Sequence, residues 1–482
     1  MLFIGATPLL PNTWYVATDF DNSYVDITLP GAAETIVVAM QQWKAAAATV
    51  KITPENAKGS WMFGNASQTK PSTGVAQDIF AKALAIEDSR GTRLVIVTYD
   101  LMGVPRTLRQ SLAKRCGDAY KLAPESLLLN VSHTHSGPEV RLYGINGDDV
   151  GAYMKDEAAA EAYGRLLEEK TFRIVGEALQ KLAPARLDYL HARAGFAMNR
   201  RRPTENGFTN APYSDGPVDH NVPVLRVTSP DGEQLRALLF GYACHPTALV
   251  NGTLISGDYV GYAQEYIQIA HPETIALFMQ GCGGDQNPYP RHTPDFVTHH
   301  GRALADAVEA ALFTVPAPVN GPLGVAFGEV ALEYAPLPSR KELQDKQNTS
   351  KDEWERGHAK WVLELMDRNH VPTSYPCPVQ VVRFGDDLVL AAIGGEVVVD
   401  YAFRLRRELA GRNVWVAGYS NDVFSYVPSL RVLKEGGYEG GGCMLYGRTH
   451  PGPWAASIED RIVSKVLELD SQLKQARQAT GR

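Results

Sequence analysis

The feature that most constrains the fold is an alternation of short apolar runs with amphipathic helical stretches, which begins at residue 93. Helical stretches such as 101–116 and 158–183 separate most of the runs. Continuously apolar strands are typical of sheets that are buried on both faces. The pattern therefore predicts an α/β fold with a mixed, largely parallel sheet flanked by helices. The runs of strand length are 93–100, 127–132, 235–244, 274–282, 387–395 and 414–420.

Composition excludes several classes of protein. The 47 basic and 54 acidic side chains leave a net charge of −7, whereas a nucleic-acid binder normally carries a basic excess. No apolar run reaches the roughly 18 residues of a membrane-spanning helix. The five cysteines are an odd number and include no Cys-x-x-Cys pair, so we expect neither a disulfide scaffold nor a cysteine-held zinc. We expect Cys244 and Cys282 to be packing residues.

The residues that follow the apolar runs carry the chemistry of the chain. His133 and His135 follow the second run, His245 the third, Asp285 the fourth and Glu396 the fifth. In open α/β sheets the ligand crevice lies outside the carboxyl ends of the strands. We therefore expect these side chains to converge on one site at that edge.

The spacing of the histidines favours a metal without settling the question. His133 and His135 are two residues apart, so both project to the same face of an extended segment. They suit two metal ligands, or one ligand with a neighbour that handles protons, but also a polar strand end with two solvated histidines. His245 alone would be a buried core histidine more often than a ligand. Glu396 opens the helical stretch 396–409, where a carboxylate also stabilises a helix start.

The remaining candidates are weaker on their own. The glycine-rich segment 281–288 lacks the Gly-Lys-Ser/Thr of a phosphate loop and is equally consistent with a tight turn. Asp285 is its candidate for chemistry. Tyr426 and Tyr438 flank a glycine-rich loop and carry little weight by themselves. The polar segment 339–370 has charges at helical spacing, which predicts a solvated helix or hairpin inserted in the domain.

Several motifs occur together in an order that resembles the neutral/alkaline non-lysosomal ceramidase family. The resemblance covers about residues 46–470 and implies an amide hydrolase acting on a sphingolipid. It further implies one zinc held by His133, His245, Glu396 and Tyr426. The motifs are VSHTHSGP at 131–138, ACHPTA at 243–248, SGDYVGYAQE at 256–265, GGDQNP at 283–288 and, within 420–441, SNDVFSYVPS and GGYEGG.

The same resemblance implies that His135 lies beside the metal and that Arg200 and Tyr438 face the scissile group. One residue departs from the family pattern, because Asn287 stands where the Gly-Asp-x-Ser-Pro motif places a serine that is proposed as nucleophile. Asparagine cannot be that nucleophile, although it can orient a substrate or donate to an oxyanion.

The resemblance also sets the expected domains. We expect an N-terminal extension at 1–45, one catalytic domain at 46–470 and a polar tail at 471–482, without the immunoglobulin-like C-terminal domain of the ceramidases proper. Members of the family are often exported, which implies a secreted or periplasmic protein. Residues 1–43, however, contain no Lys or Arg and carry no legible signal peptide.

These observations lead to one leading hypothesis with two alternatives. The leading hypothesis is a zinc-dependent hydrolase that cleaves the amide bond of an N-acyl, lipid-like substrate with zinc-activated water. His135 or Asp285 would relay the proton, while Arg200 and Tyr438 would stabilise the oxyanion. The same zinc site acting on an ester, lactone or glycosidic bond is the second reading, and a non-catalytic binding relative is the third.

Overall fold

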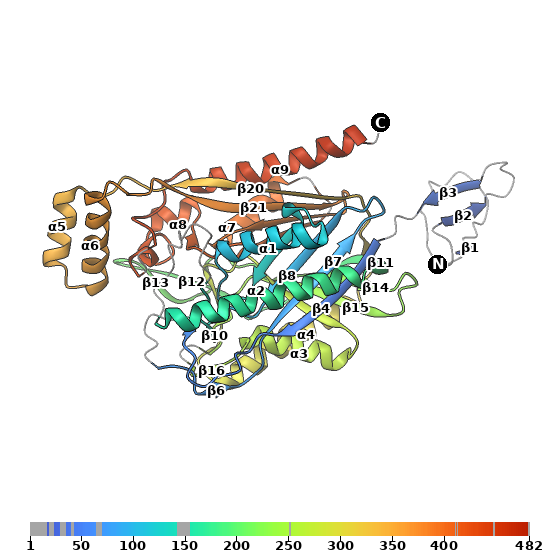
Figure 1. The fold of residues 1–482 in the computed structure, drawn as a ribbon, viewed down its shortest axis with the longest axis horizontal. Helices are drawn as coiled ribbons and strands as arrows, with labels where there is room; N and C mark the ends of the chain where they lie inside the picture. The colour runs from blue at the N-terminus through green and yellow to red at the C-terminus, as the bar shows by residue number, and fades with distance from the viewer. Residues whose placement is uncertain are drawn as a thin grey trace.

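The computed structural model describes residues 43–63, 70–141, 155–249, 252–409, 411, 413–446 and 449–480, together with the backbone of three short N-terminal strands. Two sheets lie face to face with helices on their outer faces (Figure 1). The N-terminal strands are β1 (Ala17–Thr18), β2 (Tyr24–Thr28) and β3 (Thr35–Ala39), which form a small sheet of their own.

The larger sheet has nine described strands, eight of which form a continuous path. The first two strands of the path pair in parallel, as do the last two, and the pairs between them are antiparallel. The path is β17 (Ile275–Gln280), β15 (Leu235–Tyr242), β14 (Asn221–Thr228), β11 (Ala183–Arg193), β4 (Trp43–Lys51), β7 (Phe80–Glu87), β8 (Arg93–Tyr99) and β9 (Leu127–Val131), and β19 (Ala317–Pro318) pairs with β11.

The smaller sheet has four strands in chain order. Its first two pairings are antiparallel and its last is parallel. The strands are β20 (Leu323–Glu333), β21 (Ser374–Phe384), β22 (Leu388–Ile393) and β24 (Asn413–Ala417).

The expectation of a largely parallel sheet is wrong, although the mixed α/β class is correct. All six apolar runs are strands, and they form the three parallel pairs β8–β9, β15–β17 and β22–β24. The centre of the larger sheet is antiparallel because tight turns join neighbours such as β7 and β8, where the Gly91 amide donates to the Asp88 carbonyl. The antiparallel centre consists of β14, β11, β4 and β7. Two of these strands, β4 and β7, precede residue 93, where the apolar alternation begins.

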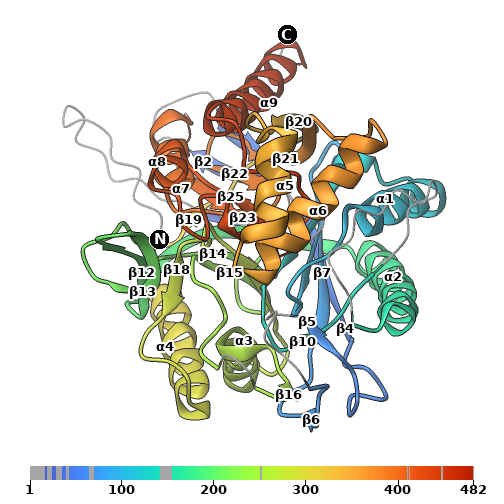
Figure 2. The same ribbon diagram turned by 90° about the vertical axis from the view of Figure 1, so that its left-hand side faces the viewer.

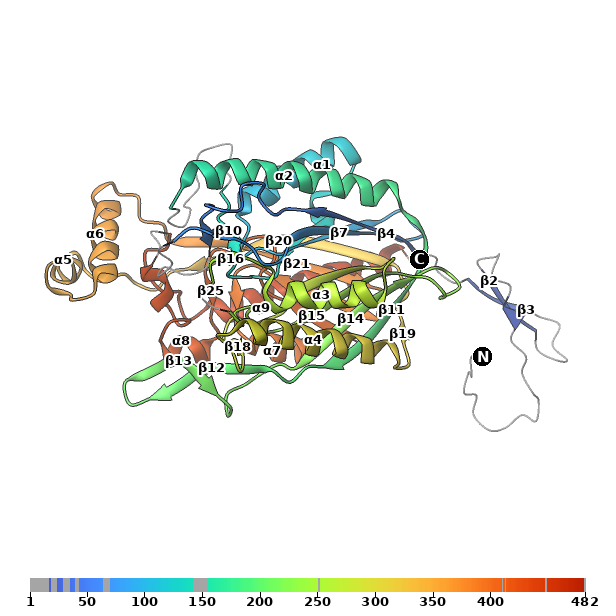
Figure 3. The same cartoon turned by 90° about the horizontal axis from the view of Figure 1, so that it is seen from below.

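Burial on both faces explains why the strands are continuously apolar. Val95 and Val97 of β8 pack under helices, whereas Leu94 and Ile96 face the core between the two sheets. Trp415 of the smaller sheet lies in that same core. The helices that cover the outer faces are α1 (Arg106–Tyr120), α2 (Glu157–Gln180), α3 (Asp258–Ala270) and α4 (Pro294–Leu312) on the larger sheet, and α7 (Asp400–Glu408) and α9 (Ile458–Thr480) on the smaller one (Figure 3).

The polar segment 339–370 forms the predicted hairpin. It consists of α5 (Arg340–Thr349) and α6 (Glu353–Asp367), inserted between β20 and β21. Ser339 and Glu342 form a capping box that starts α5, and a small apolar cluster that includes Leu343 and Val362 closes the pair. The hairpin projects from one end of the molecule and lies in front when that end faces the viewer (Figure 2).

Short elements complete the fold, many of them at the end where the parallel strands terminate. The sheet already begins at Trp43, and residues 471–480 of the expected polar tail continue α9. In the described ranges we find no helix of the length and apolar character that crossing a bilayer requires. The short elements are β5 (Met62–Phe63), β6 (Gly74–Val75), β10 (Gly137–Pro138), β12 (Ala197–Thr204), β13 (Gly207–Tyr213), β16 (Leu254–Ile255), β18 (Gln286–Pro288), β23 (Glu396–Val397), β25 (Tyr426–Val427), α8 (Leu430–Glu435) and the 3₁₀ turns η1 (Pro124–Ser126) and η2 (Gly442–Leu445).

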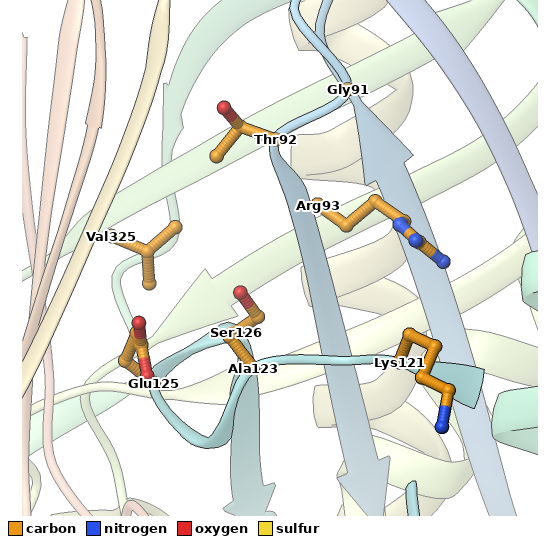
Figure 4. Close-up of a pocket in the computed structure, with 8 residues that line it drawn as sticks. All are labelled: Gly91, Thr92, Arg93, Lys121, Ala123, Glu125, Ser126 and Val325. Atoms are coloured by element: carbon orange, nitrogen blue, oxygen red, sulfur yellow. The ribbon is translucent and has the colours of Figure 1, made fainter. Parts of the chain in front are cut away.

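A small cavity of about 210 Å³ lies at the opposite end of the parallel strands (Figure 4). Its walls come from the start of β8, including Arg93, and from the segment before β9, including Lys121 and Glu125. Because ligand sites of such folds lie at the carboxyl ends of the strands, this cavity does not bear on the chemistry.

Asn130, fully buried in β9, holds the carboxyl ends of three strands together. Its side-chain Nδ2 donates to the Gly418 carbonyl (2.9 Å) and to Ser420 Oγ (3.1 Å), just beyond β24. Its Oδ1 accepts the amide of Gln280 (2.8 Å), the last residue of β17. The two sheets are thus joined at the edge that carries the reactive residues.

We expect Asn130→Ala to lower the free energy of unfolding by about 2–4 kcal/mol, because it leaves buried backbone groups without partners. Asn320, an exposed residue whose amide donates to Asp387, provides the control: Asn320→Ala is expected to cost no more than about 1 kcal/mol. Urea denaturation followed by circular dichroism measures both. Equal losses in the two variants would contradict the role of Asn130.

Candidate metal and catalytic site

Three histidines converge at the carboxyl ends of the strands. His133 follows β9, and His245 follows β15. One ligand atom from each of these two and from His135 lies within 4.8 Å of the others. His133 and His245 are fully buried, whereas His135 is partly accessible. The convergence predicted from the strand ends is therefore present for these three side chains.

Backbone carbonyls fix the orientation of the two buried rings. The Nδ1 of His133 lies 2.6 Å from the Met102 carbonyl, and the Nδ1 of His245 lies 2.6 Å from the Gly283 carbonyl. A carbonyl only accepts, so each Nδ1 carries a proton and each Nε2 is turned toward the site. His133 adopts a left-handed backbone with φ 69°, a strained state that is typical of functional positions.

Glu396 completes the cluster. Its Oε2 lies 3.1 Å from the Nε2 of both His133 and His245. Burial opposes ionisation of this carboxyl, but the two histidines outweigh it and hold its pKa well below the ordinary value. The contact with His133 lacks hydrogen-bond geometry, and the buried Nε2 of His135 also has no partner in the described residues.

Two buried nitrogens without a hydrogen-bond partner in the described residues, beside a histidine and a carboxylate, fit a cation between them. Burial and the nearby Arg200 lower the pKa of His245 to about 4, and burial together with the other two histidines lowers the pKa of His135 well below the ordinary value. Both rings are therefore neutral at pH 7, which is the form that binds a metal. The donor set of imidazole nitrogens and one carboxylate suits zinc.

The position of Glu396 differs from the expectation of a helix start. It lies in the short strand β23, and α7 begins only at Asp400. The reason is pairing: β23 lies parallel to β25, with Glu396 opposite Tyr426. Directly paired residues point to the same face of a sheet, so this register carries both side chains to the histidines.

Tyr426 and Arg200 form the wall beside His245. The Tyr426 hydroxyl lies 3.4 Å from His245 Nε2 and accepts a hydrogen bond from Arg200 Nη2 (2.8 Å). Arg200 sits at a bulge in β12, where the register with β13 shifts between Asn199 and Arg201. Bulges re-aim side chains, and this one lets two successive arginines reach the same loop.

Glu439 forms ion pairs with both of those arginines. The sequence analysis did not single it out. It accepts Arg200 Nε (2.8 Å) on one oxygen and Arg201 Nη1 (2.6 Å) on the other, and it is almost fully buried. Arg201 also binds Glu435 and the Gly436 carbonyl. The loop that carries Tyr438 is therefore clamped to β12. The adjacent arginines at 200 and 201 were the only signal in the sequence for such an acidic partner.

Tyr438 and Asn287 lie next to Tyr426 and Arg200. The Tyr438 ring lies 5.3 Å from that of Tyr426 and is 42% exposed, so it faces solvent. Asn287 is buried, and its Oδ1 accepts Arg200 Nη1 (3.2 Å) and the Thr247 hydroxyl (3.3 Å). At this position the side chain orients Arg200.

Asp285 belongs to a different set of contacts. Its carboxylate accepts the Val399 amide (2.9 Å) and Asn199 Nδ2 (3.3 Å), and Arg431 lies 3.7 Å away. Burial raises its pKa to about 7. These bonds support the segments that carry Glu396 and Arg200, and no contact among the described residues supports the proton relay that was predicted for Asp285.

Tyr419 is a second residue that the sequence missed. Its ring lies 4.7 Å from that of His133, and its fully buried hydroxyl has no hydrogen-bond partner in the part of the chain that the structure describes. It lies near the end of the sixth apolar run, two residues beyond β24, so its position was accessible to the strand-end argument. Its residue type gave no such signal, because tyrosine is common in this chain and often lies in protein cores.

His450 and Trp454 hold the backbone segment that carries Tyr426. Its Nε2 donates to the Phe424 carbonyl (2.9 Å), and its Nδ1 accepts the hydroxyl of Tyr334 (2.8 Å). Trp454 Nε1 donates to the carbonyl of Tyr426 itself (2.9 Å). Burial lowers the pKa of His450 to about 4, so this ring is neutral in the folded protein.

Comparison with known proteins identifies relatives of the chain. Residues 45–291, just over half of the chain, match the family described as neutral/alkaline non-lysosomal ceramidase, N-terminal. Neutral ceramidases B and A of Dictyostelium discoideum are 28% and 29% identical over 256 and 254 residues, which is 48% of this chain in both cases. The aligned part spans about a third of each relative's length (33% and 34%).

Two solved structures share the fold. The crystal structure of neutral ceramidase from Pseudomonas aeruginosa has a TM-score of 0.68 at 22% identity, covering 90% of this chain and 75% of that one. A structure described as ceramidase complexed with C2 has a TM-score of 0.67 at 20% identity, covering 90% and 76%. Glu396 and Tyr426 lie beyond the sequence match, so their place beside the histidines rests on the geometry above.

We expect Glu439→Gln to reduce kcat/KM for any cleaved substrate about 100-fold, because an NH2 donor replaces one of the two oxygens that accept from the arginines and Arg200 loses its counter-charge. Glu435→Gln is the matched control, since Glu435 contacts Arg201 and Arg431 but not Arg200, and it should change kcat/KM less than about threefold. Steady-state kinetics and metal content measure the difference. Loss of bound metal in Glu439→Gln would contradict a role exerted through Arg200.

The free energy of unfolding should fall as the pH drops from about 6.5 to about 4, because the unfolded chain then binds a proton at residue 450 that the folded one excludes. His450 alone contributes a slope of up to about 1.4 kcal/mol per pH unit, in total about 3 kcal/mol. Urea denaturation at pH 7, 6 and 5 should show a shallower slope for His450→Gln than for the native protein. Identical slopes would refute this assignment.

Proposed function

Because the chain belongs to the neutral/alkaline non-lysosomal ceramidase family, we propose that it is a zinc-dependent hydrolase that cleaves the amide bond of an N-acyl, lipid-like substrate. The observation that carries the proposal is the cluster of His133, His135 and His245 around the Glu396 carboxylate, in which the buried Nε2 atoms of His133 and His135 have no hydrogen-bond partner among the described residues. The similarity to neutral ceramidases supports an amide of the ceramide type.

Four residues would hold the metal. His133 and His245 present their Nε2 atoms, Glu396 presents Oε2, and the Tyr426 hydroxyl lies next to His245. When bound, zinc would supply a Lewis acid that polarises the substrate carbonyl and lowers the pKa of water. Burial raises the pKa of the Tyr426 phenol well above its ordinary value, and the Arg200 guanidinium beside the hydroxyl partly opposes that rise.

The surrounding residues would bind and orient the substrate. Arg200 makes three of its five possible hydrogen bonds to Glu439, Asn287 and Tyr426, which fixes the plane of its guanidinium. The positive charge then stabilises negative charge that develops on the carbonyl oxygen. Tyr438 lies at the entrance, where its hydroxyl can donate to the same oxygen.

Proton transfer falls to His135. Its ring is neutral, lies 5.0 Å from that of His133 and 5.9 Å from that of His245, and has a buried Nε2 without a hydrogen-bond partner in the described residues. A neutral imidazole at this place accepts a proton from the attacking water and returns it to the leaving nitrogen. With asparagine at 287, no serine is needed for the reaction, because water is the nucleophile.

We expect the purified protein to contain about one zinc per chain and to lose turnover when a chelator removes it. Zinc, but not magnesium, should restore activity, because magnesium prefers oxygen ligands. Elemental analysis and hydrolysis of a panel of N-acyl amides, esters, lactones and glycosides measure both. Cleavage of esters, lactones or glycosides without amides would select the second reading, and absence of turnover with zinc bound would select the binding protein.

His245→Ala should lower both zinc content and kcat at least about 100-fold, because three donors hold the metal poorly at this site. His191→Ala is the control, since His191 is exposed and its ring binds only Asn221 in the described contacts. Unchanged zinc content and activity in His245→Ala would show that the cluster is not a metal centre.

A further inference from the structure

A continuous row of aromatic rings leads from the candidate metal site to the inserted helical hairpin. Tyr426, beside His245, contacts Tyr438 with ring centroids 5.3 Å apart. Tyr438 contacts Tyr446 (5.9 Å), and Tyr446 contacts Trp354 (5.4 Å). Trp354 is the second residue of α6. The row therefore joins the site to a segment whose position in the fold the proposed chemistry does not explain.

The three outer rings are unusually exposed for their type. The side chains of Tyr438, Tyr446 and Trp354 are 42%, 39% and 43% exposed, whereas Tyr426 at the inner end is buried. Exposed apolar side chains that adjoin one another mark binding surfaces more often than isolated ones do. Here the exposed rings adjoin one another and lead into a site.

The row is held in place rather than formed by loose surface side chains. The Cys443 amide donates to the Tyr438 carbonyl (2.9 Å) and the Tyr446 amide to the Cys443 carbonyl (3.2 Å), so η2 fixes two of the rings relative to each other. On the hairpin side, His358 of α6 donates to the His450 carbonyl (2.9 Å). His450 in turn donates to the carbonyl of Phe424, two residues before Tyr426. The hairpin thus keeps a fixed position relative to the metal ligands.

We propose that Tyr438, Tyr446 and Trp354 form an aromatic track that binds the apolar chain of the substrate, with Trp354 contacting only chains long enough to reach the hairpin. The inference rests on the proposed function for the identity of that chain as the acyl or lipid tail of an amide. The row of rings is continuous with the site, so we infer that the substrate's own chain occupies it. A chain attached to a carbonyl at the metal would leave the site past Tyr438. Each methylene that the track removes from water stabilises binding.

The track predicts that kcat/KM depends on the length of the substrate's apolar chain and that this dependence requires Trp354. N-Acyl-p-nitroanilides with butanoyl, octanoyl and dodecanoyl groups give kcat/KM at three chain lengths with the same leaving group. Trp354→Ala should lower the ratio of kcat/KM for dodecanoyl to that for butanoyl about tenfold, through KM, which corresponds to about 1.4 kcal/mol. Trp354→Phe should recover most of the ratio, because it keeps a ring in place.

Phe313→Ala is the matched control, since Phe313 is an aromatic side chain that is 90% exposed and lies after α4, away from the hairpin. It should leave the ratio unchanged. Equal effects of Trp354→Ala at all three chain lengths would overturn the proposal, because they would indicate a general disturbance of the site. So would loss of binding to phosphatidylcholine vesicles by Trp354→Ala with an unchanged ratio, since that result would assign Trp354 to a membrane contact.

Failure of the proposed function would leave the track testable. If the native protein cleaves none of the anilides, calorimetric titration of the zinc-loaded protein with butanoate and dodecanoate replaces the kinetic assay. Trp354→Ala should then weaken dodecanoate about tenfold relative to butanoate. Unchanged or equally reduced affinities for the two carboxylates would refute the track independently of catalysis.

Discussion

The remainder of the site depends on the contact of one carboxylate with two buried histidines. A charge buried as deeply as that of Glu396 is tolerated only when opposite charge or hydrogen-bond donors compensate for it. Both facing imidazoles are held by carbonyls at Nδ1, so each turns its Nε2 toward Glu396. Around them Arg200, Glu439 and Arg201 form a shell in which positive and negative side chains alternate.

Much of the site could be predicted from the sequence because strand ends in an α/β fold meet. His133, His135 and His245 follow runs whose length and composition identify them as strands, and these runs are strands in the structure. The pairing partners of those strands were not predictable in the same way. An antiparallel neighbour such as β4 alternates buried and exposed residues only imperfectly, and it lies before the region where helices punctuate the chain.

The features of the site that sequence reasoning missed share one property, which is that they depend on pairing or packing across long separations. Glu396 was assigned to a helix start because the residues after it form α7, whereas a two-residue strand paired with Tyr426 determines its direction. Glu439 becomes meaningful only through the bulge in β12 that brings two arginines to it. Tyr419 differs from other buried tyrosines only in its neighbour and its unpartnered hydroxyl. Local patterns in the sequence contain none of this information.

The placement of the helical insert has a consequence for how such a protein can diversify. Strands β20 and β21 keep one uninterrupted antiparallel register up to the pair Glu333 and Ser374, directly where the insert leaves and re-enters the sheet. The hairpin also has its own capping box and its own small apolar cluster. The hairpin is therefore a separable insertion. Its length and the residues at its tip can change while the strands stay in register and the residues at the strand ends keep their positions.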